Sequence, residues 1–575
     1  MVSGNHTLTY RELSTLSNRI ANHLRASGIA PRTFVGLGLQ RCLELPAALL
    51  GILKSGAAYV PLDPSYPPAR IAQMIASSKL DFVVTTEDLS NCFPNVSAIC
   101  IDGPVIAHAP TDLSPTEIGE NDLMYAIFTS GSTGDPKAAS VFHRGFENLL
   151  HWYSKELALG PRDRTLIVSS PSFDLTQKNL FAPLTTGGTL ILDECQTYDI
   201  TRILSLIRQH DVTLINCTPS AFYPLIEAAA SDQYCALASL RYAVLGGEPI
   251  FIPRLRGWLE HPNCNAEIVN TYGPTECTDI CAYYRLHQGN LDDFPFVPLG
   301  SEIPNVQISI RDESLQLLSK GEVGEVCISG SGVGGGYLHD PERTAEAFPE
   351  LMYRTGDLAK RHPGDILEFR GRVDHQVKVN GFRIELGELE IALNQHPKVR
   401  EAVVVASQNR LIAHIQGTAG ASELREYLSD RLPAYMVPGE FRFVEKFPLT
   451  PNGKLDRLAL ASREEHVPFP TVSGTPLEVK ILELWSAVLD REVSDATANF
   501  FDLGGNSIHL AVIHVRLMEM SERKFPITAL FALPSARAIA GFLSPNGVHA
   551  ATNGAQDRAR LARGAISRFR KPLSR

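Results

Sequence analysis

Residues 128–139 read FTSGSTGDPKAA, a loop of serine, threonine and glycine that carries one lysine. The loop follows the apolar run DLMYAI, which is typical of a buried strand. A strand followed by glycines and a lysine presents backbone N–H groups to an anion, so the stretch indicates a phosphate-binding loop. An ordinary surface turn is the alternative, because glycine and serine are also the default residues of turns.

The spacing within this loop excludes the Walker P-loop. That motif needs four residues between its first glycine and a Gly-Lys-Ser/Thr triplet. Here Gly131 and Gly134 are three positions apart, and Pro136 precedes Lys137. Because proline opposes a helix that starts at the lysine in the Walker manner, a P-loop nucleotidase or switch is not indicated.

Short apolar runs alternate with amphipathic helical stretches from about residue 8 to residue 370. The runs include FVGLGL, TLIVSS and VTLINC, and RELSTLSNRIANHLRASG is one of the helical stretches. This alternation predicts an α/β domain with layers of helices and largely parallel sheets, and its length predicts more than one sheet. A smaller α+β piece follows, and a helical pattern comes last.

Composition shifts along the chain predict five segments. They are a large N-terminal core over 1–371, a small α+β part over 372–462, a linker rich in Pro, Gly and Ser over 463–476, a helical domain over 477–545 and a basic tail over 546–575. We expect the tail to be disordered or to dock on a partner.

The composition limits the function classes. With 575 residues, 44% of them apolar and 20% charged, the chain is typical of a globular protein of several domains. Its net charge of −10 argues against a nucleic-acid binder. No run approaches the about 18 apolar residues of a membrane span, and no signal-peptide pattern begins the chain, so we expect a cytoplasmic protein without a membrane partner. The ten cysteines form no CxxC pair, so neither a disulfide framework nor a zinc site is indicated.

Further motifs follow the opening loop. They are NTYGPTE at 270–276, YRTGDLAK at 353–360, GRVDHQVKVNGFRIELGELE at 371–390, PNGKLDR at 451–457 and FFDLGGNSI at 500–508. The loop and the first four motifs stand in the order of the adenylate-forming superfamily of acyl-CoA synthetases and luciferases. The chain strongly resembles an amino-acid adenylation domain of a nonribosomal peptide synthetase, and the last motif resembles the phosphopantetheine site of a peptidyl carrier (thiolation) domain.

This resemblance implies an AMP-forming ligase with a large adenylation core, a small mobile C-terminal subdomain and a four-helix carrier domain. It implies that an α-amino acid is activated with ATP and Mg²⁺ as aminoacyl-AMP and then passed to 4′-phosphopantetheine on the carrier. A phosphopantetheinyl transferase is the implied partner that attaches this arm. No HHxxxDG or GxSxG stretch appears, so we expect a loading module whose condensation, tailoring or release enzyme acts in trans.

The resemblance also assigns roles to single residues. Glu276 matches the magnesium ligand, which suits the preference of Mg²⁺ for oxygen. Lys454 matches the lysine that reaches the substrate carboxylate and the α phosphate, Asp374 matches the hinge, and Ser507 matches the phosphopantetheine attachment site. The other residues assigned to ATP are Ser130, Ser132, Thr133 and Lys137 at the β and γ phosphates, Thr275 near the α phosphate, Asn270 and Tyr272 at adenine, and Asp357 and Arg372 at the ribose.

Asp174 matches the carboxylate that pairs with the substrate α-amino group, which favours an α-amino acid over a fatty or aryl acid. The polar residues of the side-chain pocket predict a small or polar substrate, with Gln, Glu, Asn, Ser and Cys as candidates, because an apolar substrate would leave buried polar groups unpaired. The alternative is that Lys178 and Asp279 pair with each other and leave a tighter, less polar pocket. By the same resemblance the pocket residues are Leu175, Lys178, Asn216, Val244, Gly246, Thr271, Asp279 and Ile280.

Two other functions compete with this interpretation. An acyl- or aryl-acid CoA ligase would share the loop, the hinge and the lysine, but it is disfavoured by Asp174 and by the fused carrier. A carrier scaffold with an inactive adenylation domain is disfavoured because Lys137, Glu276, Asp357 and Lys454 are all present.

Overall fold

The structure is a computed structural model that describes residues 1–131, 135–374, 376–407, 410–448, 455, 457–462, 474–489, 492–501, 503, 505, 507–521, 523 and 525–544. The chain divides into two compact units. The first consists of Met1–Gln196 and Arg202–Glu388, and the second consists of Thr197–Thr201 and the described residues from Leu389 onward. No helix in this described part of the chain is long and apolar enough to span a membrane.

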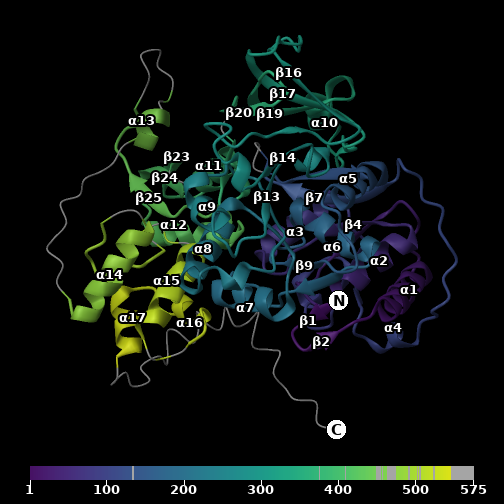
Figure 1. The fold of residues 1–575 in the computed structure, drawn as a ribbon, viewed down its shortest axis with the longest axis horizontal. Helices are drawn as coiled ribbons and strands as arrows, with labels where there is room; N and C mark the ends of the chain where they lie inside the picture. Colours follow the sequence, from purple (N-terminus) through teal and green to yellow (C-terminus); the bar gives the residue numbers. More distant parts are fainter. Residues whose placement is uncertain are drawn as a thin grey trace, which may run out of the picture. The chain divides into compact units, whose positions relative to one another are not determined.

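A seven-stranded sheet of the first unit carries the opening loop, which joins β7 to β8 (Figure 1). The strand order is β18-β8-β7-β4-β3-β5-β6; β8 pairs antiparallel with its two neighbours, and the other pairs are parallel. Lys137 therefore begins a strand, as expected for a loop unlike the Walker type. The strands are β3 (Phe34–Leu37), β4 (Ala58–Pro61), β5 (Phe82–Thr85), β6 (Ser97–Cys100), β7 (Leu123–Thr129), β8 (Lys137–Phe142) and β18 (Gly336–Tyr337).

A nine-stranded sheet is the second layer of strands. Its order is β15-β14-β13-β12-β11-β9-β10-β1-β2, and the run from β13 to β1 is parallel. The antiparallel strands are at the two edges. The strands are β1 (Val2–Ser3), β2 (His6–Thr7), β9 (Arg164–Ile167), β10 (Thr189–Leu192), β11 (Leu214–Cys217), β12 (Tyr242–Gly246), β13 (Glu267–Tyr272), β14 (Ala282–Leu286) and β15 (Ser301–Glu302).

Two helices separate these sheets. α5 packs on β7 and β8, α6 packs on β9, β10 and β11, and the two helices pack on each other. A chain of ring contacts crosses the layers, with Tyr125 and Phe146 centroids 5.8 Å apart and Phe146 and Phe181 centroids 5.0 Å apart. The helices of this unit are α1 (Tyr10–Ala26), α2 (Leu45–Ser55), α3 (Pro68–Ser78), α4 (Pro104–His108), α5 (His143–Glu156), α6 (Asp174–Thr186), α7 (Ile200–His210, whose first residues belong to the second unit), α8 (Pro219–Ala229), α9 (Ile252–Leu259) and α10 (Pro341–Ala347).

A four-stranded antiparallel sheet and a hairpin complete the first unit. The sheet has the order β16-β17-β19-β20, and its strands are β16 (Val306–Arg311), β17 (Val323–Gly330), β19 (Tyr353–Arg361) and β20 (Leu367–Arg372). Burial alternates along β19, which directs Tyr353, Thr355 and Asp357 to one buried face. The hairpin consists of β21 (Gln376–Val379) and β22 (Phe382–Glu385).

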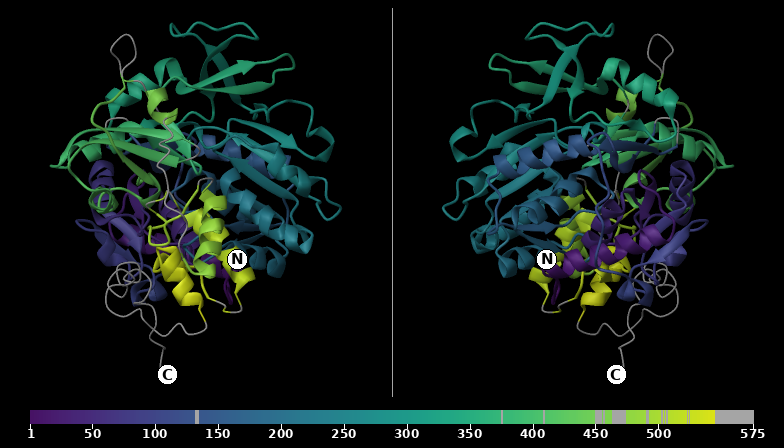
Figure 2. Two further views of the ribbon diagram at one scale, coloured as in Figure 1. Left: turned by 90° about the vertical axis from the view of Figure 1, so that its left-hand side faces the viewer. Right: turned by 90° about the vertical axis from the view of Figure 1, so that its right-hand side faces the viewer.

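The second unit contains a small α+β part and a helical part. The α+β part has a sheet of β23 (Val399–Ser407), β24 (Arg410–Gly417) and β25 (Glu440–Phe443), with α12 (Ala421–Ser429) and α13 (Arg457–Ser462). α11 (Leu386–Asn394) begins in the first unit and ends in the second. The helices of the last part group together in both views of Figure 2; they are α14 (Pro476–Leu489), α15 (Ser507–Met520), α16 (Thr528–Phe531) and α17 (Ala536–Leu543).

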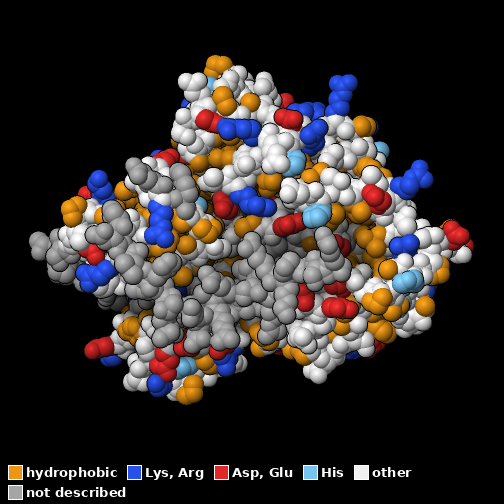
Figure 3. All heavy atoms as spheres, turned by 90° about the horizontal axis from the view of Figure 1, so that it is seen from below, with side chains coloured by type: hydrophobic (Ala, Val, Ile, Leu, Met, Phe, Trp, Pro, Cys, Tyr) orange, Lys and Arg blue, Asp and Glu red, His pale blue; other side chains and the backbone are white. Residues whose placement is uncertain are grey.

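The last four helices have an apolar core of their own, centred on Trp485 and Phe500, whose rings lie 4.9 Å apart. The predicted fold class is therefore confirmed: an α/β unit with layered sheets, a small α+β part and a four-helix domain. On the face drawn in Figure 3, the described acidic and basic side chains are interspersed.

Candidate active site

The predicted side-chain pocket lies at the carboxyl ends of parallel strands, where α/β sheets commonly bind ligands. Asn216 of β11 is opposite Val244 of β12, and Gly246 is opposite Thr271 of β13. A Cβ at Gly246 would meet Thr271 Oγ1 at 2.6 Å, so this close approach requires glycine. The fold thus brings these four predicted residues to one edge of the sheet.

A buried ion pair joins two other predicted pocket residues. Lys178 Nζ donates hydrogen bonds to Asp279 Oδ2 at 2.6 Å and to the Leu175 carbonyl oxygen at 3.0 Å. The Lys178 side chain is 1% exposed and that of Asp279 is 10% exposed. Burial raises the pKa of Asp279 to about 6, although Lys178 opposes this rise. The pairing that the sequence left open is thus present, and the adjacent Ile280 is buried.

The amide of Asn216 is also satisfied within the protein. Asn216 Nδ2 donates to the Val244 carbonyl oxygen at 2.7 Å, and Asn179 Nδ2 donates to Asn216 Oδ1 at 2.7 Å. Tyr153 OH donates to Asn179 Oδ1 at 2.8 Å, and burial raises the pKa of Tyr153 so that it stays a donor. Within the part of the chain that the structure describes, Asp279 accepts its side-chain hydrogen bond at Oδ2, which leaves Oδ1 for a ligand.

Asp174, at the start of α6, connects the pocket to the turn after β13. Its Oδ1 accepts a hydrogen bond from the Leu175 N–H at 2.7 Å, and its Oδ2 accepts one from Thr275 Oγ1. Asp174 and Thr275 are 101 residues apart in sequence. The fold therefore brings the residue predicted to bind an α-amino group directly against one predicted to lie near the α phosphate.

Glu276 is the most buried carboxylate among the predicted site residues. It lies in a short 3₁₀ helix, Thr275–Cys277, and its side chain is 0% exposed. Arg383 Nη1 lies 2.7 Å from Oε2, and Tyr337 OH donates to Oε1 at 2.8 Å. Lys137 Nζ lies 3.7 Å from Oε1. Burial alone would raise the pKa of Glu276, but Arg383 and Lys137 outweigh it and lower the pKa to about 2.

The described end of the phosphate loop contacts the β21–β22 hairpin and the start of α11. Ser130 Oγ donates to the Arg383 carbonyl oxygen at 2.9 Å and accepts from the Glu385 N–H at 3.2 Å. The Gly131 N–H donates to Glu388 Oε2 at 3.2 Å, and Arg70 pairs with the other oxygen of Glu388 at 2.7 Å. Ser132 and Thr133 lie outside the described residues.

The predicted ribose and adenine residues come from β13, β19 and β20. Asp357 accepts hydrogen bonds from Tyr272 OH at 2.7 Å and from Arg372 Nη1. Arg372 also holds Asp374 through two hydrogen bonds, at 2.7 and 2.6 Å, so it bridges the predicted ribose carboxylate and the predicted hinge. Asn270 Nδ2 donates to the Pro298 carbonyl oxygen at 2.7 Å. These predicted residues lie together, with both oxygens of Asp357 engaged.

The sequence matches the AMP-binding enzyme family over residues 1–338, which is more than half of its length. The chain belongs to the AMP-binding enzyme family. The AMP-binding enzyme C-terminal domain matches residues 388–454, and the phosphopantetheine attachment site family matches residues 479–543. The predicted combination of adenylation and carrier regions is confirmed.

Relatives of this AMP-binding enzyme are nonribosomal peptide synthetases. Tyrocidine synthase 3 of Brevibacillus parabrevis is 36% identical over 569 residues, which cover 95% of the chain and 9% of that protein. The dimodular nonribosomal peptide synthase of Bacillus subtilis strain 168 is 36% identical over 582 residues, covering 94% of the chain and 24% of that protein. The chain thus spans less than a quarter of the length of each of these relatives.

Two solved structures share the fold of this AMP-binding enzyme. A synthetase protein with adenylation and carrier domains, bound to a vinylsulfonamide inhibitor, is 27% identical with a TM-score of 0.80, and the match covers 94% of this chain and 93% of that one. A four-domain synthetase bound to AMP and glycine is 28% identical with a TM-score of 0.58, covering 95% of this chain and 42% of that one.

The surroundings of Glu276 suit a magnesium ion that is shared with substrate phosphates. Mg²⁺ is usually held by one or two carboxylates together with phosphate oxygens and waters. Glu276 is an ionised carboxylate at neutral pH, because its pKa is about 2. Across the described ranges no group of three or more His, Cys, Asp or Glu side chains could hold a metal ion. Glu276 would therefore hold the ion together with phosphate oxygens of ATP.

The side chains of two predicted residues of this AMP-binding enzyme lie outside the described part of the structure. Ser507 is the first residue of α15, but its side chain lies outside the described residues. Lys454 lies outside them altogether. Their assigned roles stay predictions.

Three residues of the site were not predicted. Arg383 lies within the motif GRVDHQVKVNGFRIELGELE at 371–390, and its positive charge was the one feature that could have marked it as a site residue. Lys378 is its cross-strand partner in the hairpin; burial lowers the pKa of Lys378, while Asp357 and Asp174 oppose this change. Tyr337 follows a run of glycines, and no sequence pattern marks its hydroxyl as a partner of Glu276.

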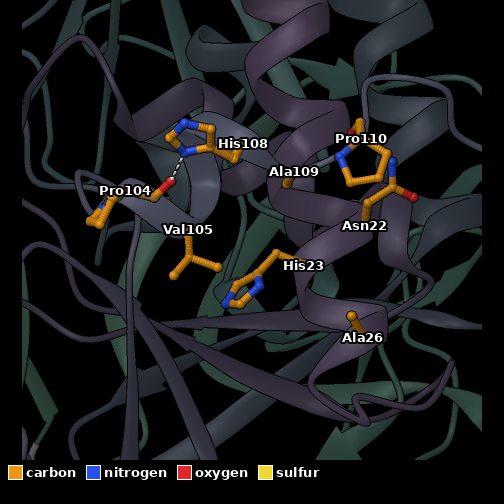
Figure 4. A pocket seen from close by; sticks show the side chains of 8 residues that line it. All are labelled: Asn22, His23, Ala26, Pro104, Val105, His108, Ala109 and Pro110. Atoms are coloured by element: carbon orange, nitrogen blue, oxygen red, sulfur yellow. Dashed lines mark hydrogen bonds between the residues drawn. The ribbon is translucent and has the colours of Figure 1, made fainter.

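A surface hollow of about 520 Å³ lies between α1 and α4, away from these groups (Figure 4). His108 Nδ1 lies 2.7 Å from the Pro104 carbonyl oxygen, so the hollow is partly shaped by a contact within α4. No predicted site residue lines it; the lining residues are Asn22, His23, Ala26, Pro104, Val105, His108, Ala109 and Pro110.

Proposed function

We propose that this chain activates an α-amino acid with ATP and transfers the aminoacyl group to its own carrier domain. In the first half reaction, a carboxylate oxygen of the amino acid attacks the α phosphorus of ATP, and the bond to pyrophosphate breaks. In the second, the acyl carbon is transferred to sulfur and AMP leaves. Phosphopantetheine on Ser507 would supply that thiol, and a phosphopantetheinyl transferase is needed to attach it.

The contact between Asp174 and Thr275 is the observation that carries this proposal. Asp174 is an anion suited to a substrate ammonium group, and it contacts Thr275 directly. The residue after Thr275 is Glu276, a buried and ionised carboxylate. An acyl- or aryl-acid CoA ligase needs no carboxylate at the first position, because its substrate lacks the ammonium group. The arrangement therefore favours an amino acid over the alternative acids.

The roles proposed for the protein groups follow from charge. Departure of pyrophosphate spreads negative charge over several oxygens, which Lys137 and the N–H groups of the phosphate loop would stabilise. Glu276 would hold Mg²⁺, which neutralises phosphate charge when it is bound. Asp357 would bind the ribose hydroxyls, with Arg372 beside it. Lys454 would supply a further positive charge to the α phosphate and the substrate carboxylate.

The proposed substrate has a small or polar side chain. The Lys178–Asp279 pair and the Asn216 amide are largely satisfied within the protein, so among the described pocket residues Asp279 Oδ1 is the acceptor left for a substrate, instead of several unpaired groups. Candidates are Gln, Glu, Asn, Ser and Cys. A condensation, tailoring or release enzyme acting in trans would take up the loaded aminoacyl group.

Intact-protein mass spectrometry tests the proposal. The full chain is treated with a phosphopantetheinyl transferase, ATP, Mg²⁺ and pooled amino acids, with Ser507→Ala as the control. We expect a mass increase of one aminoacyl group in the wild type and none in the control. Attachment of the arm without loading would refute the proposed substrate class, and aryl and hydroxy acids with free CoA would be tried next.

A further inference from the structure

Tyr153 contacts the polar groups of the predicted substrate pocket, either directly or through one intermediate side chain. It lies on α5, is 0% exposed and is not among the predicted pocket residues. Its hydroxyl donates to Asn179, and Lys178 Nζ lies 5.7 Å from the centroid of its ring. Because Asn179 donates in turn to Asn216, one buried tyrosine supports both an amide and a cation of the pocket.

The chain of hydrogen bonds from Tyr153 to Asn216 has one possible direction. A carbonyl oxygen can only accept, so the Val244 carbonyl identifies the nitrogen of the Asn216 amide. The Leu175 carbonyl, 2.6 Å from Asn179 Nδ2, does the same for Asn179. The oxygen of Asn216 therefore accepts from Asn179, and the oxygen of Asn179 accepts from the Tyr153 hydroxyl. Two backbone carbonyls thus orient both amides, and Tyr153 is the donor at the start of the chain.

The ammonium group of Lys178 is held by three groups of the protein. It donates to Asp279 Oδ2 and to the Leu175 carbonyl, and the face of the Tyr153 ring attracts the same charge. The Leu175 carbonyl also accepts from Asn179, so the ion pair and the chain of amides form one network. An ammonium group has three N–H donors, so Lys178 has little capacity left for a substrate carboxylate.

The network leaves one donor and one acceptor for a ligand. An amide nitrogen has two N–H groups, and in the described part of the chain one N–H of Asn216 has an acceptor, the Val244 carbonyl. Asp279 Oδ1 accepts no hydrogen bond from a described residue. A primary carboxamide both donates and accepts, whereas a carboxylate only accepts and an apolar side chain does neither. The remaining donor and acceptor therefore match the side chain of asparagine or glutamine.

We propose that Tyr153 and Asn179 are positioning residues that orient the polar groups of the pocket for a substrate with a side-chain carboxamide. The selectivity of the pocket then depends on residues outside its predicted lining. Loss of the Tyr153 hydroxyl leaves the buried oxygen of Asn179 unpaired, so Asn179 no longer holds Asn216 in a single orientation. This inference rests on the proposed function and narrows its substrate class.

Amino-acid-dependent pyrophosphate exchange in the full chain tests this role through a ratio. The kcat/KM for Gln is divided by that for Met, and the kcat/KM for Asn by that for Leu, because the members of each pair have similar shapes. The wild type should prefer the carboxamide. Tyr153→Phe should lower the larger of the two preferences by about tenfold, the effect of one unpaired buried polar group. Phenylalanine keeps the ring beside Lys178, so the substitution tests the hydroxyl alone.

Tyr59→Phe is the matched control. Tyr59 is also 0% exposed, and its hydroxyl donates at 2.6 Å to the side-chain oxygen of Gln177, on the same helix as Asn179. Gln177 Nε2 donates to carbonyl oxygens within residues 171–173, which precede Asp174. We therefore expect Tyr59→Phe to lower the unfolding temperature about as much as Tyr153→Phe. Any effect on exchange should be a common factor for all amino acids, so the ratio stays unchanged.

A double-mutant cycle with Asn216→Ala shows whether Tyr153 acts through Asn216. Asn216→Ala removes the donor at the end of the chain, so it should itself lower the carboxamide preference by about tenfold. Adding Tyr153→Phe should then change the preference by less than about twofold, because the group that Tyr153 positions is gone.

Three results would overturn the inference. They are a carboxamide preference that Tyr153→Phe leaves unchanged or that Tyr59→Phe lowers equally, full additivity of Tyr153→Phe and Asn216→Ala, and a wild type that prefers Met to Gln and Leu to Asn. Failure of the proposed function is distinct, because the wild type would then exchange pyrophosphate with no amino acid.

Discussion

The buried ion pairs of Glu276 and Asp279 differ in what surrounds the carboxylate. Glu276 has Arg383 and Lys137 near it, and its pKa falls to about 2. Asp279 has one cation, Lys178, which burial outweighs with a smaller contribution from the nearby Asp174 carboxylate, so its pKa rises to about 6. Sequence separations are similar, 107 residues for Glu276 and Arg383 and 101 for Lys178 and Asp279.

The comparison suggests that burial alone does not determine what an ion pair can do. On the nucleotide side, the surplus of positive charge keeps the carboxylate ionised and ready to hold a cation, whether an arginine or a metal. On the substrate side, burial outweighs the single cation and raises the pKa of Asp279 to about 6. The Glu276 pair is therefore suited to binding a cation, and the Lys178–Asp279 pair is suited to discriminating between substrate side chains.

The largest expected effect is on stability, from Lys178→Met. It leaves the buried Asp279 carboxylate without its cation, which should destabilise the first unit by about 3–5 kcal/mol. Calorimetric unfolding of the full chain at pH about 7 measures the change. The matched control is Lys320→Met, since Lys320 and its partner Asp365 are both 58% exposed. Exposed pairs contribute about 0–1 kcal/mol, so equal losses in the two variants would contradict the prediction.

Glu276→Gln tests the other carboxylate through activity. The variant removes the proposed metal ligand and leaves Arg383 and Lys137 facing a neutral amide. Pyrophosphate exchange should fall by about 10²–10³-fold, comparable to the loss of one group that stabilises the transition state. Raising the Mg²⁺ concentration should restore little of it. A variant that keeps exchange within about threefold of the wild type would exclude Glu276 as the ligand.

The pH dependence of stability should have opposite signs in the two regions. Glu276 has a lowered pKa, so its contribution is present at neutral pH and is lost as the pH falls towards about 2. Asp279 has a raised pKa, so the cost of its charge is absent in acid and grows as the pH rises through about 6.

Unfolding temperatures of the wild type, Glu276→Gln and Asp279→Asn across pH test this contrast. The advantage of the wild type over Glu276→Gln should shrink by about 2 kcal/mol between pH 5 and pH 3. Relative to Asp279→Asn, the wild type should gain about 2 kcal/mol between pH 6.5 and pH 4.5. If acid changed the stability of the wild type relative to Glu276→Gln and relative to Asp279→Asn in the same direction, the opposite pKa shifts would be contradicted.

The sequence predicted much of the fold because strands and turns have local signatures. The apolar run before the phosphate loop forms β7, and alternation along YRTGDLAK directs Asp357 inward on β19. The GPTE turn places Glu276 after β13. Each of these features depends on residues within a few positions, where steric and burial preferences act directly.

The contacts of the site were harder to predict because they join distant segments. Nothing near Glu276 indicates that Arg383, 107 residues later, faces it, and nothing near Tyr337 indicates a hydroxyl aimed at the same carboxylate. For Lys178 and Asp279 the resemblance identified both as pocket residues, so their pairing could be considered but not decided. Only the three-dimensional arrangement decides which cation faces which carboxylate.

The smallest expected effect is a preference of the enzyme for amide over carboxylate side chains of the same shape, Gln over Glu and Asn over Asp. With Lys178 held on Oδ2, Asp279 Oδ1 can accept a hydrogen bond from a substrate amide but repels a substrate carboxylate. Pyrophosphate exchange at neutral pH should therefore favour Gln over Glu and Asn over Asp by about tenfold, the effect of one unpaired buried polar group.

The ratio should narrow in acid, as Asp279 takes up a proton near pH 6, and should narrow in Asp279→Asn at every pH. A dependence on pH that persists unchanged in Asp279→Asn would assign the selectivity to another group. Preference for Leu, Phe or Trp would instead mean that the closed Lys178–Asp279 pair makes the pocket effectively apolar. In that case the second ion pair serves the fold alone, and only the nucleotide side of the comparison is functional.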